Sequence, residues 1–178
     1  MKLLKSILII VLAFAFSFSF VSCSKDVETP RGMKLIESEF VSYKMYVPEE
    51  WAIVSDFGFV SALCTDDKSS VSMLTMTGTK AYSNIEEYID EYKSELASTY
   101  VGFEYIESES TMTGISLGGK DAARIVYKIR MGDTEYKYMQ VITAVGYYVY
   151  TLTYTALSEN FDAHLEDVYK IIEHFSFG

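Results

Sequence analysis

Three consecutive segments in the C-terminal half of the chain alternate apolar and polar side chains with a period of two. They cover residues 122–131, 135–145 and 147–156. This alternation is typical of β-strands that bury one face, and fifteen tyrosines, many of them beside valine, isoleucine or threonine, favour pleated sheet. The breaks between the segments are short and contain Gly132 and Gly146, as hairpin turns require. The pattern therefore predicts an antiparallel meander.

Four more segments are predicted to be strands from their apolar and β-branched content. They cover residues 39–48, 52–64 with a break at Gly58, 69–77 and 103–113. Pro48 ends the first of them, and Asp66-Asp67-Lys68-Ser69 is a polar hairpin loop after the second.

In two segments the apolar residues recur every three or four positions instead of every second position, so these segments are predicted to be amphipathic helices. The first runs over 84–99, with Ser83 and Glu86 in a capping-box arrangement, and the second follows Ser158 as its cap and ends near His174. The predicted fold class is α+β, with an antiparallel sheet of about six to seven strands flanked by two helices. A closed, lipocalin-like barrel is the less favoured alternative, because a barrel does not need two amphipathic helices.

The N-terminus has the layout of a secretory signal. Lys2 and Lys5 precede an apolar run over 7–21, which is shorter than the roughly 20 residues that span a bilayer. Small residues before Cys23 resemble the lipobox of bacterial lipoproteins, in which the cysteine thiol carries a diacylglycerol, although Phe20 stands where those proteins usually have leucine. The alternatives are an ordinary secretory signal or an uncleaved anchor, and both also place the domain outside the cytoplasm.

This interpretation divides the chain into a signal peptide (1–22), a lipidated tether (23–34) and a single domain (35–178). A lipidated Cys23 cannot form a disulfide, which leaves Cys64 as a lone thiol. We expect Cys64 to be buried as a small apolar residue, because the adjacent Asp66 and Asp67 oppose a reactive thiolate.

The charge and the missing motifs exclude several classes of function. Without the two signal-peptide lysines the net charge is about −12, which disfavours nucleic acid and anionic lipid headgroups as partners. His164 and His174 lack the i, i+4 spacing of a helical metal pair, and Asp66-Asp67 is interpreted as a solvated turn. No phosphate-binding loop, nucleophile elbow or zinc-protease motif is present. We therefore assign no catalytic, cofactor-binding or metal-binding residues, and expect neither an enzyme nor a cofactor.

A family resemblance is carried by the order of several weak motifs. These are Tyr43 to Trp51 with its Pro-x-x-Trp turn, the Gly118-Gly119-Lys120 turn before a strand, the tyrosine-rich meander, and the closing helix followed by Ser176-Phe177. From about residue 35 to 177, their order resembles the PsbP-like group, which also includes DcrB lipoproteins and Mog1-like proteins. The resemblance implies an α/β/α sandwich. Members have unrelated, mostly non-catalytic roles, so no functional residue is carried over.

Taken together, these features predict a membrane-anchored extracytoplasmic lipoprotein. We expect it to contact the membrane through the lipid on Cys23 and to bind or stabilise an envelope protein partner. One alternative is a lipoprotein that binds a small ligand or a metal ion, which the tyrosine-rich faces and the net acidity favour. Another alternative is an enzyme whose catalytic residues are far apart in the sequence and come together only in the folded protein.

Overall fold

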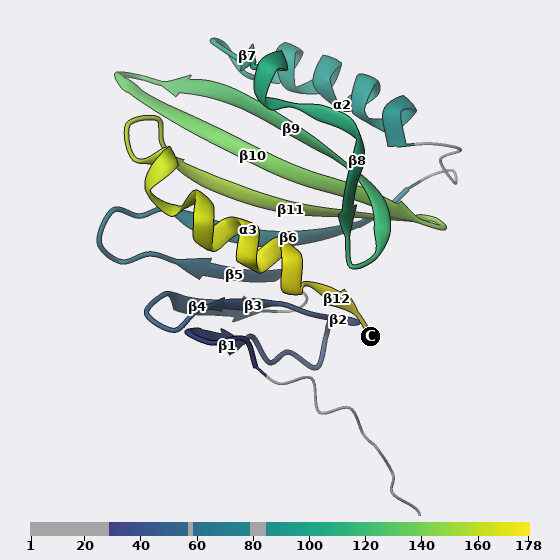
Figure 1. The fold of residues 1–178 in the computed structure, drawn as a ribbon. Helices are drawn as coiled ribbons and strands as arrows, with labels where there is room; N and C mark the ends of the chain where they lie inside the picture. The colour runs from purple at the N-terminus through teal and green to yellow at the C-terminus, as the bar shows by residue number, and fades with distance from the viewer. Residues whose placement is uncertain (1–28, 57–58, 79–84) are drawn as a thin grey trace, which may run out of the picture.

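The computed structural model of the protein describes residues 29–56, 59–78 and 85–178. In this part of the chain the main feature is an eight-stranded antiparallel sheet with the strand order β4-β5-β6-β11-β10-β9-β7, in which β8 also pairs with β9 (Figure 1). The strands are β4 (Ala52–Asp56), β5 (Phe59–Leu63), β6 (Ser70–Thr77), β7 (Glu104–Tyr105), β8 (Thr111–Leu117), β9 (Lys120–Met131), β10 (Thr134–Val145) and β11 (Tyr148–Leu157). The sheet confirms the predicted α+β class and has slightly more strands than expected.

Shorter elements complete the fold. Two small sheets pair β1 (Met33–Leu35) with β3 (Tyr46–Pro48), and β2 (Tyr43–Lys44) with β12 (Ser176–Phe177). The α-helices are α2 (Ile85–Thr99) and α3 (Leu165–His174), and the 3₁₀ turns are η1 (Glu107–Glu109) and η2 (Phe161–His164). The first strand within the described residues begins at Met33.

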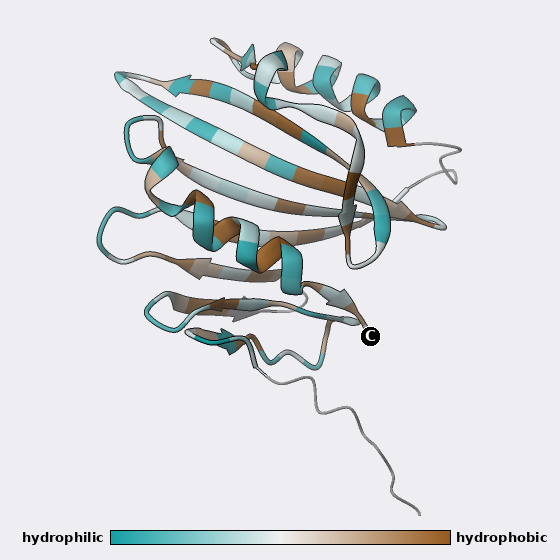
Figure 2. Ribbon diagram, in the orientation of Figure 1, coloured by the Kyte–Doolittle hydropathy of each residue, from teal (hydrophilic) through white to brown (hydrophobic). Residues whose placement is uncertain are grey.

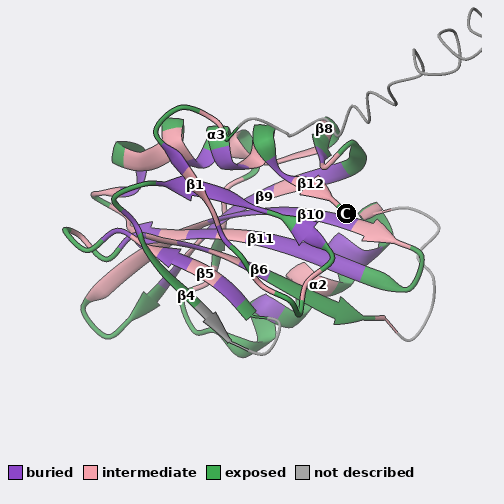
Figure 3. Cartoon of the chain, turned by 90° about the horizontal axis from the view of Figure 1, so that it is seen from below, coloured by how far each residue is buried: buried purple, intermediate pink, exposed green. Residues whose placement is uncertain are grey.

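The predicted meander is confirmed as the centre of the sheet. β9, β10 and β11 pair without a register shift, from Met131 opposite Thr134 to Val145 opposite Tyr148. Gly132 and Gly146 turn the chain at φ +64°, in the left-handed region that tight hairpins use. The middle parts of these strands are buried (Figure 3).

One face of the sheet is covered by α3 together with the N-terminal strands. Val168 and Ile171 of α3 are fully buried in a cluster with Leu152 and Met73 of the sheet. Trp51, which is 1 % exposed, belongs to the same core, and its backbone N–H donates to the Pro48 carbonyl at 3.1 Å. The Pro-x-x-Trp segment is therefore a turn that anchors the N-terminal strands to this core.

On the other face α2 packs mainly over β9 and β10, and Val149 of β11 belongs to the same apolar cluster. Ile89 of α2 is fully buried against Ile125 and Ile142. Gln140 of β10 donates from Nε2 to the hydroxyl of Tyr92 on α2 at 3.2 Å. Figure 2 shows apolar and hydrophilic residues alternating along both helices, as in amphipathic helices. Helices thus lie on both faces, as the α/β/α sandwich predicts.

Three sequence predictions about single elements are wrong in detail. The strand predicted over 39–48 is divided into β2 and β3 at Met45, whose carbonyl accepts from the N–H of Ile36. The strand predicted over 103–113 is interrupted by η1, because the Ser110 hydroxyl donates to the Ile106 carbonyl and replaces a ladder bond. Ser158 is not the helix cap, since the chain enters α3 through η2 from Asn160. The predicted cap at Ser83 lies outside the described residues.

Candidate functional site

A tight loop between β5 and β6 carries two side chains that can ionise or bind a metal ion, Cys64 and Asp67. The Cys64 N–H donates to the Ser69 carbonyl at 2.8 Å, and the Lys68 N–H donates to the Cys64 carbonyl at 3.1 Å. Lys68 has φ +67°, a conformation that non-glycine residues rarely adopt, so the loop holds some backbone strain. The Ser69 N–H donates to Oδ1 of Asp67 at 2.9 Å and orients the carboxylate.

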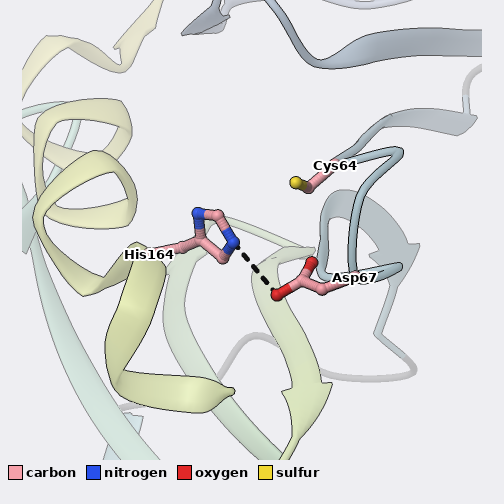
Figure 4. A group of neighbouring side chains, drawn as sticks. All are labelled: Cys64, Asp67 and His164. Atoms are coloured by element: carbon pink, nitrogen blue, oxygen red, sulfur yellow. Dashed lines mark hydrogen bonds and ion pairs between the residues drawn. The ribbon is translucent and has the colours of Figure 1, made fainter.

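A third side chain reaches this loop from a distant part of the sequence. His164 ends η2, just before α3, and its Nε2 lies 3.1 Å from Oδ2 of Asp67. The donor atoms of Cys64, Asp67 and His164 all lie within 4.8 Å of one another, and their side chains point toward a common space (Figure 4). We call this group the Cys-Asp-His cluster.

The surroundings of His164 hold its ring in place. The Trp51 ring meets the imidazole edge to face at 5.4 Å between centroids. On the other side of the ring, Nδ1 lies 4.0 Å from a carboxylate oxygen of Asp167. Cys64 is 6 % exposed, whereas the side chains of His164 and Asp67 are each 20 % exposed. The cluster is therefore partly buried with limited access to solvent.

The electrostatics keep Asp67 ionised. Burial by itself raises the pKa of the carboxyl group, but the backbone and side chain of Ser69 and the imidazole of His164 outweigh it and lower the pKa below its ordinary value. The cluster thus combines an ionised carboxylate with an imidazole ring and a cysteine sulfur.

A nucleophilic role for Cys64 does not fit this geometry. An activated thiol needs a base within hydrogen-bonding distance, and within the described residues no hydrogen bond joins the Cys64 sulfur to His164. The imidazole Nε2 faces Asp67 instead. The arrangement is better suited to holding a cation, or to tying the β5–β6 loop to the start of α3.

Sequence reasoning found the members of the cluster but not the cluster itself. The burial of Cys64 is confirmed. The interpretation of Asp66-Asp67 as a solvated turn is wrong for Asp67, whose carboxylate bonds Ser69 and His164. Asp67 and His164 are 97 positions apart, and no spacing rule connects them. His174 is exposed at the end of α3, as expected. Cys23 lies outside the described residues, so its lipidation stays a prediction.

A second feature is the half of the sheet that α2 leaves uncovered. The register places Leu74 and Met76 of β6 on the same face as Ile142 and α2, and neighbouring strands add Val54 and Phe59. All four are exposed, Leu74 by 45 %. Partly buried serines and a threonine lie between them; these are Ser61, Ser72 and Thr153. We call this surface the open sheet face.

No helix within the described part of the chain is long and apolar enough to cross a membrane. A scan against protein-family models found no match for the sequence, and a search of curated proteins also found none.

Solved structures do resemble it. A Bacteroides thetaiotaomicron protein aligns at TM-score 0.58 and 15 % identity, over 83 % of this chain and 49 % of its own, so the chain spans about half of that protein. LpqN, involved in cell envelope biogenesis of Mycobacterium tuberculosis, aligns at TM-score 0.54 and 14 % identity, over 81 % and 89 % of the two chains. Synechocystis PsbP (CyanoP) aligns at TM-score 0.56 and 12 % identity, over 83 % and 93 %.

The geometry thus defines a class of α+β domain with an antiparallel sheet between helices. Within that class, the likeness to PsbP confirms the PsbP-like fold inferred from the sequence. Identities this low establish the fold alone.

Proposed function

We propose that this protein is a membrane-anchored extracytoplasmic lipoprotein whose PsbP-like domain is a non-catalytic binding module for an envelope protein. The open sheet face is the observation that carries the proposal. The shared fold with LpqN, a protein of envelope biogenesis, supports the cellular setting.

The open sheet face has the composition of a protein-binding surface. Contiguous exposed apolar side chains are rare on monomeric proteins unless they bind something. Here Leu74 and Met76 sit beside small polar residues, an arrangement similar to an interface centre with a polar rim. Among the described residues, α2 packs mainly on β9 and β10, and the exposed apolar side chains of β4, β5 and β6 form the surface that we propose for the partner.

The predicted anchor places this surface near a membrane. Only residues 24–32 separate Cys23 from β1. Even fully extended, that segment reaches roughly 30 Å. A lipidated Cys23 would therefore keep the domain within reach of membrane proteins and their exposed segments.

A cross-linking pull-down from cells tests the proposal. The full chain serves as bait beside a Leu74→Asn/Met76→Asn variant, which removes the apolar centre of the open sheet face. Val101→Asn is the matched control, because Val101 is apolar and 95 % exposed but follows α2, next to Gly102, which lies beside Arg130 of β9 rather than beside β4, β5 or β6. We expect the wild type and the control to enrich the same protein, and the double variant to lose it. Recovery no higher than with a lipidated bait lacking the domain would refute the proposal.

A further inference from the structure

We propose that Cys64, Asp67 and His164 form a binding site for a divalent transition metal, with Zn²⁺ as the fitting ion. The inference concerns a different surface from the open sheet face and does not depend on the proposed function. It goes beyond the sequence analysis, which assigned no metal-binding residues.

The donor atoms are of the types that zinc selects. A thiolate sulfur, an imidazole nitrogen and a carboxylate oxygen are its usual protein ligands. Oxygen-only cations such as Mg²⁺ and Ca²⁺ do not use sulfur. The combination in the Cys-Asp-His cluster therefore favours zinc over the hard cations.

The spacing of the donors needs little adjustment. Zinc bonds of 2.0–2.3 Å in a tetrahedron separate ligand atoms by roughly 3.4 Å. The Nε2 of His164 and Oδ2 of Asp67 are already 3.1 Å apart. The Cys64 sulfur, a ring nitrogen of His164 and a carboxylate oxygen of Asp67 all lie within 4.8 Å of one another. A change of about 1 Å in side-chain position brings the three donors around one ion. The Cys64 thiol would release its proton to solvent on binding.

The scaffold holds the ligands as a metal site would. Asp167 lies 4.0 Å from the non-ligating Nδ1 of His164, beyond hydrogen-bonding distance, and a small side-chain movement would make it the carboxylate that orients a metal-bound imidazole. The Ser69 N–H holds the second oxygen of Asp67. Three protein ligands leave a fourth position for water or for a donor from a partner. The partial exposure of Asp67 and His164 gives that position access to solvent.

Metal binding would join two separate parts of the fold. Cys64 and Asp67 belong to the β5–β6 loop, and His164 belongs to the junction of η2 and α3. An ion held by both would fix this end of α3 to the sheet. Because the unfolded chain has no preformed site, binding must also raise the stability of the domain.

Cobalt is the direct probe, because Co²⁺ bound to a thiolate gives a charge-transfer absorption in the near ultraviolet. The full chain, purified in mild detergent and stripped with a chelator, is titrated with Co²⁺ and then with Zn²⁺. We expect one equivalent of Co²⁺ to produce the thiolate band and Zn²⁺ to abolish it. Absence of the band from the wild type overturns the proposal and leaves the cluster with a structural role only.

Variants assign the band to the cluster. We expect Cys64→Ser to abolish it, and His164→Gln and Asp67→Asn each to weaken Co²⁺ affinity by at least about tenfold. The matched controls are His174→Gln and Asp66→Asn, which change the other histidine and the neighbouring acid. Circular dichroism checks that each variant is folded. Persistence of the band in Cys64→Ser would assign it to Cys23, and equal losses in the controls would indicate unspecific binding; either result overturns the site.

Discussion

At the scale of single residues, Gly118 and Gly119 form a matched pair in one turn. Both have positive φ, but a Cβ on Gly118 would lie 2.7 Å from the Phe177 ring, whereas a Cβ on Gly119 would meet nothing within 4 Å. Phe177 cannot easily move, because it packs against Phe175 and Tyr150. We therefore expect Gly119→Ala to lower the free energy of unfolding by about 1–2 kcal/mol and Gly118→Ala by about 2–5 kcal/mol in urea denaturation. Equal losses would show that the closing Phe177 contact is not formed.

Glu135 gives a residue-scale prediction about pH. Hydrogen bonds from Lys128 and Arg130, together with the nearby Ser158 hydroxyl, lower the pKa of its carboxyl group to about 2. A depressed pKa stabilises the fold above the ordinary carboxyl range, roughly 4.3, and this contribution is lost as the pH falls toward 2. The difference in unfolding free energy between wild type and Glu135→Gln should thus be present at neutral pH and shrink over that interval.

The same measurement in a Lys128→Met background is the control for Glu135. Lys128 lies 2.9 Å from Glu135, so its removal should reduce the effect of Glu135→Gln. The pair is solvent-exposed, and added salt should weaken it as well. An effect of Glu135→Gln that does not change with pH would contradict the ion-pair explanation.

The sequence shows the chemistry of each residue but not which distant residues lie close together. For this reason the Cys-Asp-His cluster could not be predicted as a group. Cys64 is correctly expected to be buried because its segment is apolar. Its proximity to His164 depends on how α3 packs on the sheet, a long-range contact with no local pattern.

At the scale of elements, α2 is attached to the sheet through a narrow apolar stripe. Ile89 is fully buried at the centre of that stripe, whereas Ile85 is only partly buried at its first turn. We expect Ile89→Ala to lower the free energy of unfolding by about 2–5 kcal/mol, because it leaves a cavity. Ile85→Ala should have a clearly smaller effect, measured in the same urea titration. Similar losses at both positions would mean that α2 is not seated as described.

The elements that the sequence predicts well are those with a long, regular period. The meander and α2 follow their patterns to within a few residues. The prediction for 103–113 is wrong because Ser110 bonds the Ile106 carbonyl and the Val126 N–H, and the side chain thereby takes the place of backbone pairing. Short segments whose conformation depends on such side-chain hydrogen bonds have no regular apolar–polar period from which they could be predicted.

At the scale of the whole molecule, the order of elements predicts the α+β class, because the hydrophobic faces of two helices and a meander have few ways to be buried together. The PsbP-like fold was implied by the resemblance in the order of the motifs, and the likeness to PsbP confirms it. Neither predicted which part of the sheet stays exposed. Within the described residues, the open sheet face lies beyond β9 and β10, the strands that α2 mainly contacts, and the length of a helix says nothing about where it will lie. The proposed partner surface is thus a property of the assembled fold.

We propose that Cys23 holds this domain at a membrane. Membrane fractionation tests this proposal directly, in cells that produce either the full chain or its Cys23→Ala variant. The account predicts that the wild type sediments with membranes and carries a diacylglyceryl group on Cys23, detected by mass spectrometry of the N-terminal peptide. Cys64→Ala is the control, because it removes the chain's other cysteine and should leave the fractionation unchanged. The Cys23→Ala protein should lose the lipid and, once its signal is cut, appear in the soluble extracytoplasmic fraction. Cys23→Ala protein that still sediments with membranes after its signal peptide is removed would contradict the account.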